Sequence, residues 1–168
     1  MKIRNIAKLV SLSFFALLIL MLFYSCSSSK SAVKLNSNEV KNIVDSSRFV
    51  FVAERVNPLR GPSRYLTSRY DVVVKKDTVN CYLPYFGRAY QAPMDPSKGG
   101  IQFISTNFSY NYTEKSNNQW EVTIKPNDYE DVQQLYFNIF ENGTASLNVV
   151  STHRDAISFT GHIERIKQ

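Results

Sequence analysis

Short runs in which hydrophobic and polar residues alternate occupy most of the chain after residue 48. In the first run, Phe49, Phe51 and Ala53 lie on one side of an extended chain, and the run ends at residues 57–58. Alternation with a period of two predicts strands that bury one face. Runs rich in β-branched and aromatic residues also occupy residues 70–75, 78–83, 101–112, 120–125, 133–140, 144–150 and 156–166. The chain therefore predicts about seven or eight strands.

Residues typical of turns separate these strands. Lys76-Asp77 is a candidate for a tight hairpin, residues 114–118 for a longer one, and residues 58–68, which include Gly61, for a loop. Asn142-Gly143 predicts a type I′ turn, which needs positive φ at both central residues. Short turns join antiparallel strands, so the expected fold is an all-β, mainly antiparallel meander that curls into a barrel or folds into a sandwich.

One short helix is expected before the strands. Asn36 and Glu39 have the spacing of a capping box, and the hydrophobic positions 40, 43 and 44 then share one helical face. The periodicity changes to two soon after, so the helix should end near residue 46. We expect residues 36–168 to form a single β-rich domain.

The N-terminus has the layout of a secretory signal over residues 1–25. A basic start precedes an uncharged apolar run over residues 9–24, which is shorter than the roughly 20 residues of a membrane-spanning helix. Cys26 follows this run and a small residue, and so resembles the lipobox cysteine of bacterial lipoproteins. That resemblance implies that Cys26 carries a diacylglyceryl group and that residues 26–35 form a flexible tether. A plain signal peptide and a membrane-spanning anchor are the alternatives.

The same resemblance implies a location in the cell envelope, where the lipid holds the protein to a bacterial membrane. Ser27 follows the cysteine and no acidic run comes after it. We therefore expect the periplasmic face of the outer membrane rather than the cell surface. The membrane is then one expected partner, and an envelope protein is the other.

Net charge gives little support for a nucleic-acid partner. The formal charge is +6, but Lys2, Arg4 and Lys8 lie in the targeting segment, and no acidic residue precedes Glu39. Removing that segment removes half of the net charge, so we expect no binding to nucleic acid.

The two cysteines leave no internal disulfide if Cys26 is lipidated. The remaining one, Cys81, alternates with Val79 and Leu83, and a buried structural thiol is expected there.

The most distinctive segment is YLPYFGRAY at residues 82–90, followed by QAP at 91–93 and GGIQF at 99–103. At these residues the chain resembles the Bacteroidota lipoprotein family catalogued as domain of unknown function 4251. The likeness runs from about residue 49 to residue 163 and includes Arg154. It implies a cell-envelope lipoprotein, and it implies no reaction, because the family has no assigned activity.

The same segment supplies the candidate binding residues Tyr85, Phe86, Arg88 and Tyr90. A proline has no N–H for the strand ladder, so Pro84 should end its strand. We expect Gly87 to adopt a backbone angle that other residues avoid. The aromatic rings would then line a pocket in which Arg88 binds a carboxylate or phosphate. Alternatively, the rings close one end of the barrel, and Arg88 donates to exposed carbonyls.

No constellation for catalysis or metal binding is evident. His153 and His162 lack partners at the spacing of a zinc site or a catalytic triad. Asp128, Glu130 and Asp131 form an acidic loop that does not match a calcium loop, so a solvated turn is expected. The sequence thus predicts no metal, no cofactor and no enzymatic activity.

Two functional hypotheses remain. In the first, the protein is a membrane-tethered interaction or structural module that presents a sheet edge or the aromatic segment to an envelope protein. In the second, the barrel holds a small apolar or anionic ligand. The interior distinguishes them, because an interior filled by side chains such as Trp120 and Leu135 leaves no room for a ligand.

Overall fold

The computed structural model of the protein describes residues 35–90, 99–115 and 118–166. The expected signal peptide, the expected lipidation site Cys26 and all but the last residue of the expected tether lie outside these residues. Within the described part of the chain, no helix has the length and hydrophobicity needed to cross a membrane.

The described residues form one helix and a sheet of nine strands, which confirms the all-β class with a short N-terminal helix. The elements are α2 (Ser37–Asp45), β1 (Phe49–Pro58), β2 (Arg64–Val74), β3 (Val79–Leu83), β4 (Ile101–Ser105), β5 (Phe108–Lys115), β6 (Gln119–Pro126), β7 (Val132–Phe140), β8 (Thr144–Ser151) and β9 (Ile157–Glu164). The strand count exceeds the prediction because residues 101–112, expected as one strand, contribute to two, β4 and β5.

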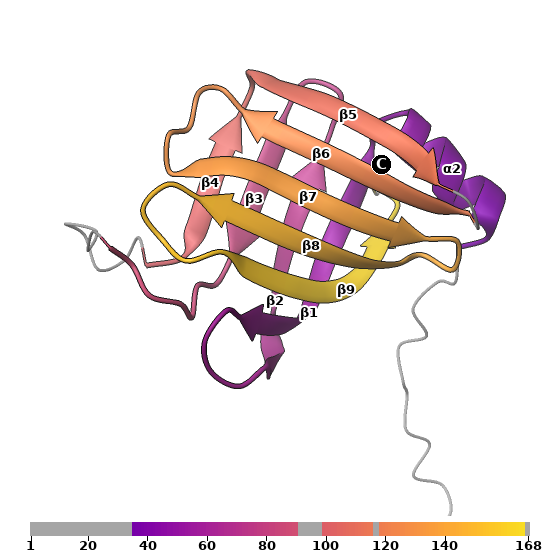
Figure 1. Cartoon of the computed structure of the whole chain (residues 1–168). Coiled ribbons are helices and arrows are strands. Elements are labelled where there is room, and N and C mark those ends of the chain that lie inside the picture. Colours follow the sequence, from indigo (N-terminus) through magenta and orange to yellow (C-terminus); the bar gives the residue numbers. More distant parts are fainter. Residues whose placement is uncertain (1–34, 91–98, 116–117, 167–168) are drawn as a thin grey trace, which may run out of the picture. The chain divides into compact units, whose positions relative to one another are not determined.

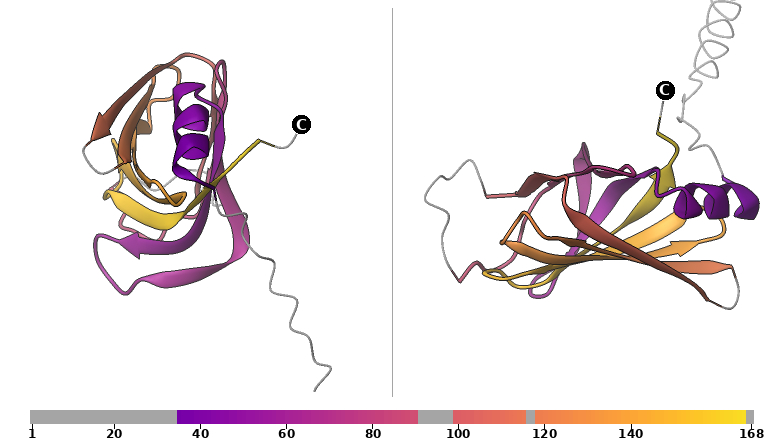
Figure 2. Two further views of the ribbon diagram at one scale, coloured as in Figure 1. Left: turned by 90° about the vertical axis from the view of Figure 1, so that its right-hand side faces the viewer. Right: turned by 90° about the horizontal axis from the view of Figure 1, so that it is seen from above.

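The strands form a nearly closed barrel. Their order is β4-β3-β2-β1-β9-β8-β7-β6-β5, and all neighbouring pairs are antiparallel. Strands adjacent in sequence therefore lie side by side, except β4 and β5. The first strand pairs with the last, and the ring is open only between β4 and β5. Figures 1 and 2 show strands β5–β9 crossing over strands β1–β4.

The opening between β4 and β5 follows from the odd number of strands. Directions alternate around the ring, so β4 and β5 run in the same direction and cannot form an antiparallel hairpin. The chain instead continues from one strand into the other through a corner at Thr106 and Asn107 (Figure 1). Strands that bend between sheets in this way join the two layers of orthogonal β structures.

Asp128 holds this corner together. Its carboxylate accepts hydrogen bonds from the buried Ser105 hydroxyl and from the backbone N–H groups of Thr106, at 2.9 Å, and Asn107, at 3.1 Å. These bonds, with the Ser105 hydroxyl contributing most, lower the pKa of the Asp128 carboxyl. The acidic loop is therefore not just a solvated turn, because one of its carboxylates has a structural role.

The barrel interior is filled by large hydrophobic side chains. The ring of Phe137 packs edge-on against Phe49 and Phe51, with ring centroids 5.6 and 5.7 Å apart. Trp120 and Leu135, which the sequence placed inside, are both fully buried. The thiol of Cys81 is buried too, as predicted, and burial raises its pKa. The core thus consists of interdigitating side chains from both layers.

The helix α2 covers one end of the barrel (Figure 2). The predicted capping box is present: the side chain of Asn36 accepts from the backbone N–H of Glu39, and the Glu39 carboxylate accepts from the backbone N–H of Asn36. Val40 and Val44 point into the core, and the hydroxyl of Tyr110 in β5 donates to the carbonyl of Val44 at 2.8 Å. The helix is therefore attached to the strand that borders the opening.

The turn between β7 and β8 lies where Asn142-Gly143 predicts it, but the type I′ assignment is wrong. Only Gly143 has positive φ, at 81°, whereas Asn142 does not. The N–H of Gly143 donates to the carbonyl of Phe140 at 2.9 Å. A three-residue loop of this kind is a type I turn followed by a left-handed glycine, which needs only one residue with positive φ.

Two other predicted loops are shorter than expected. Residues 64–68 belong to β2 because the backbone of β1 continues past a bulge and pairs Arg55 with Tyr65 and Val56 with Arg64. Similarly, residues 114–115 belong to β5, while residues 116–117 of that predicted turn lie outside the described part of the chain. The hairpin of β1 and β2 consequently extends beyond the barrel (Figure 1).

Candidate interaction surface

The aromatic segment begins where Pro84 ends β3, as predicted. Tyr85 turns inward and is half-buried, with its hydroxyl 2.8 Å from the carbonyl of Arg88 and 3.0 Å from that of Asp155. Gly87 does not have positive φ, so the predicted backbone role is wrong. It is required for space, because an added Cβ would overlap the hydroxyl of Tyr85. Tyr85 therefore closes the barrel end rather than lining a pocket.

Backbone bonds fix the rest of the segment against the connection between β8 and β9. The N–H of Tyr90 donates to the carbonyl of His153 at 2.8 Å, and the N–H of Asp155 donates to the carbonyl of Arg88 at 3.0 Å. Ala89 and Arg154 form an isolated antiparallel bridge. The segment is thus held in a defined conformation, and its side chains start from fixed backbone positions.

Arg154 is the arginine that donates to open carbonyls. Its side chain is 9% exposed, and its guanidinium donates to the carbonyls of Gly99 at 3.1 Å and Gly100 at 3.0 Å. It also pairs with Asp131 at 3.1 Å and lies over the ring of Tyr85. One sequence alternative gave this role to Arg88; among the residues that the structure describes, Arg154 makes these bonds.

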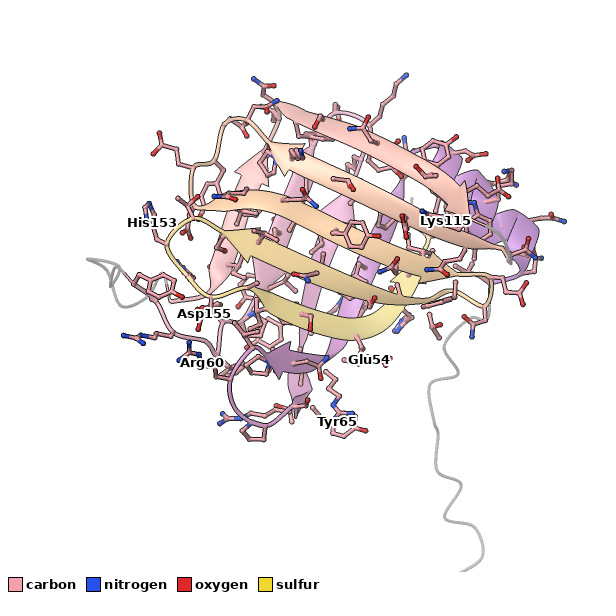
Figure 3. All side chains as sticks on the ribbon, viewed as in Figure 1. Glu54, Arg60, Tyr65, Lys115, His153 and Asp155 are labelled. Carbon is pink, nitrogen blue, oxygen red and sulfur yellow. The ribbon has the colours of Figure 1, made fainter. Side chains whose placement is uncertain are left out.

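Asp155 connects the aromatic segment to the loop between β1 and β2. Its side chain is only 5% exposed, and Oδ1 accepts a hydrogen bond from the hydroxyl of Tyr90. This bond is the main reason that the pKa of Tyr90 is raised. The Nε of Arg60 lies 3.8 Å from Oδ2, and Figure 3 shows these two side chains next to each other. A buried carboxylate therefore holds one aromatic and one basic residue of different loops together.

Three pairs, each an arginine and an aromatic ring, lie on the aromatic segment and on the hairpin of β1 and β2. The guanidinium of Arg88 lies 5.9 Å from the ring centroid of Tyr90. The corresponding distances are 5.4 Å from Arg64 to Phe86 and 5.5 Å from Arg55 to Tyr65. The rings are exposed by 61%, 42% and 79% for Tyr90, Phe86 and Tyr65. We call the exposed set the arginine–aromatic surface; it consists of Arg55, Leu59, Arg60, Arg64, Tyr65, Phe86, Arg88 and Tyr90.

The arginine–aromatic surface contains part of the predicted site and several residues that the sequence did not indicate. Phe86, Arg88 and Tyr90 belong to it as candidates, whereas Tyr85 does not. The residues from the hairpin of β1 and β2 were missed because residues 58–68 were treated as a loop without a partner. The sequence did contain a signal for these residues: arginines and a tyrosine lie next to a loop that contains proline and glycine.

The two histidines have different surroundings. Nδ1 of His162 lies 2.9 Å from Glu54, and its Nε2 lies 3.3 Å from Glu164, so the ring lies between two carboxylates on the outside of the barrel. His153 is exposed in its turn. Among the residues that the structure describes, no group of three or more His, Cys, Asp or Glu side chains is arranged to hold a metal ion.

Comparison with known proteins gives a family and a fold. The sequence pattern of the family described as Domain of unknown function (DUF4251) matches residues 32–163. A crystal structure of a DUF4251 family protein from Bacteroides eggerthii is similar, with a TM-score of 0.57 and 11% sequence identity, over 77% of this chain and 87% of that one. At this identity the likeness concerns the fold alone. No curated protein matches the chain.

Proposed function

The chain belongs to the family Domain of unknown function (DUF4251), and we propose that it is a lipid-anchored module of the bacterial cell envelope that binds a partner protein through its arginine–aromatic surface. The observation that supports this most directly is the clustering of exposed tyrosine, phenylalanine and arginine side chains on the hairpin of β1 and β2, including its loop, and on the loop of the aromatic segment, both of which are fixed by hydrogen bonds. Tyrosine and arginine are enriched at protein interfaces and in their energetic centres.

The rigidity of these loops favours binding. Tyr85, Arg154 and Asp155 already hold the backbone of the aromatic segment. A partner then loses less free energy to loop ordering than it would on a mobile surface. Tyr85 and Arg154 beneath the surface are engaged in structural bonds, so we assign it binding rather than catalysis.

Charge indicates the chemistry of the partner. Four arginines belong to this surface, and the carboxylate beside them, Asp155, is buried and already contacted by Arg60 and Tyr90. A protein with carboxylates around an apolar centre would complement it, because guanidinium groups bind carboxylates in a bidentate manner. The small-ligand hypothesis has less support, because Trp120 and Leu135 help to fill the interior.

The proposed anchor is Cys26, with the expected signal peptide removed before it and the protein held on the periplasmic face of the outer membrane. The Cys26→Ala variant should lose incorporation of a fatty-acid probe in cells, because its thiol is the acyl acceptor. Cys81→Ser is the matched control: its thiol is buried in the folded domain, and the label should remain. A label that persists in Cys26→Ala would refute the anchor.

The partner surface is tested by photo-crosslinking in intact cells. A photoreactive residue at Tyr65 or Tyr90 should capture the same envelope protein, whereas one at Ile104, which is 65% exposed on β4, should not. If Ile104 captures that protein equally well, or if neither tyrosine position yields an adduct, the surface has been wrongly assigned.

Charge reversal then tests the chemistry with the captured protein after purification. Arg64→Glu combined with Arg88→Glu should weaken binding at least about tenfold, because like charges would oppose the partner's carboxylates. Lys125→Glu changes an exposed basic residue of β6 outside the surface and should leave affinity unchanged. Equal effects of the two changes would contradict a specific role for these arginines.

A further inference from the structure

Two adjoining grooves lie beside α2, away from the arginine–aromatic surface. One, of about 660 Å³, is lined by Arg48, Lys75, Lys76, Asp77 and Ile166. The other, of about 450 Å³, shares Arg48 and Ile166 and extends along α2. The two grooves adjoin at these shared residues, and we call them together the basic groove.

The three cations of the larger groove differ from Lys41 of α2 and from Arg165 of the smaller groove. Lys41 pairs with Glu114, and Arg165 pairs with Glu39 at 2.6 Å. Within the described part of the chain, Arg48, Lys75 and Lys76 form no ion pair.

Asp77 is the one carboxylate next to these three cations in the larger groove. All four side chains are exposed, so the groove keeps an excess of positive charge that faces solvent.

The chain enters the domain close to this groove. Leu35, the first described residue, is buried at the turn between β7 and β8, where an added Cβ on Gly143 would lie 3.5 Å from it. Helix α2 starts two residues later and supplies Glu39 and Asn42 to the smaller groove. Leu35 lies nine positions after Cys26, and a fully extended chain of that length spans at most about 30 Å. A lipid on Cys26 therefore keeps this end of the barrel within reach of the membrane.

We propose that the basic groove binds the phosphate groups of anionic phospholipids in the membrane that carries the protein's own anchor. This inference rests on the proposed lipid anchor and adds a second contact to it. Basic residues near an anionic bilayer are attracted to it, and the attraction falls off within a Debye length, so only cations on the tethered end contribute. In Figure 1, α2 and the end of β9 lie at the right, whereas the loop between β1 and β2 lies at the lower left. Docking by the groove would thus leave the arginine–aromatic surface facing away from the membrane.

The test uses the lipidated full chain reconstituted into nanodiscs of phosphatidylcholine alone or with about 30% phosphatidylglycerol. Amide hydrogen exchange of residues 46–50 and 74–79 should slow at least about tenfold in the anionic discs, because the three cations are attracted to the anionic surface. Exchange in β7 should stay the same in both discs. Equal exchange at the groove in both lipids would overturn the inference.

Matched variants and a free anion identify the source of any protection. Lys76→Glu should abolish the lipid-dependent slowing, whereas Lys125→Glu, the same change on an exposed lysine of β6, should retain it. Inorganic phosphate added to neutral discs should have no effect; if it reproduces the slowing, the groove binds a free anion and the membrane inference fails.

The outcome also separates this inference from the proposed function. If the chain proves to carry no lipid, the anchor is refuted, and the protein is instead added from solution to vesicles of the same two compositions. A preference for phosphatidylglycerol that Lys76→Glu removes would support the groove without the anchor, and no preference would refute the groove as well. Crosslinking at the arginine–aromatic surface is independent of both results.

Discussion

Arg154 offers the sharpest test of how the barrel end is held together, because its environment contrasts with that of Arg88. The guanidinium of Arg154 is almost fully buried and has two carbonyl partners and one carboxylate partner. The guanidinium of Arg88, in contrast, lies over the exposed ring of Tyr90, and this is the contact it makes among the described residues. Removing the two side chains should therefore have very different effects on stability.

The magnitude for Arg154→Ala follows from the fate of each partner. The carbonyl of Gly100 is partly buried and loses a charge-assisted bond, which costs about 1.5 kcal/mol, whereas the exposed carbonyl of Gly99 is rehydrated at about 0.5 kcal/mol. Asp131, partly exposed, loses its ion pair at about 1 kcal/mol. The sum is about 3 kcal/mol, whereas Arg88→Ala should stay within about 0.5 kcal/mol.

Urea unfolding of the full chain, followed by tryptophan fluorescence, measures the stability losses of both alanine variants. With an m value of about 1.5 kcal/mol/M, Arg154→Ala should lower the midpoint by about 2 M, and Arg88→Ala by no more than about 0.3 M. Arg154→Lys, which keeps the charge but not the planar fork, should fall between them. Equal midpoints for the two alanine variants would refute the role assigned to Arg154.

Three further predictions concern single positions of the fold, each measured by urea unfolding. Gly143→Val should cost about 1 to 3 kcal/mol, because a β-branched residue is strained at φ 81°, and an unchanged midpoint would mean that the turn is misassigned. The pKa of Asp128 is lowered in the folded state, chiefly by the Ser105 hydroxyl. Its contribution to the stability of the fold is therefore present above pH 4 and is lost as the pH falls through the folded pKa. Asp128→Asn should thus be less stable than wild type at pH 7, and the difference should shrink as the pH falls below 4; a constant difference would contradict the linkage. Gly161→Ala should destabilise by at least about 1 to 3 kcal/mol, because its Cβ would overlap the carbonyl of Val52, and retention of the wild-type midpoint would show that the bulge can relax.

Local patterns in the sequence predicted the elements well because the forces that determine them are local. The capping box at Asn36 and Glu39 depends only on two residues three positions apart at the start of a helix, and it is present as predicted. The alternation that buries Cys81 likewise depends on the pleat of one strand. The turn at Gly143 was placed correctly for the same reason, although its type depends on the loop length, which the dipeptide alone does not determine.

The corner between β4 and β5 was missed because its cause lies far away in the sequence. Thr106 and Asn107 include neither glycine nor proline, and hydrophobic residues continue on both sides of them. The carboxylate that fixes the bend, Asp128, comes from the connection between β6 and β7. The candidate site shows the same limit: Arg60 joins it only through Asp155, a residue more than ninety positions later.

Closure of the barrel determines which parts of the domain can bind a ligand or a partner protein. A ligand would enter most readily at the opening between β4 and β5, but side chains cross this opening. Phe103 of β4 stacks on Tyr129, with ring centroids 4.5 Å apart, and Ser105 is bonded to Asp128. In β5 itself, Tyr110 is bonded to the helix that covers the barrel. Opening the interior would break these contacts and expose the packed aromatic core, so the outer surfaces of the domain are where binding costs the fold least.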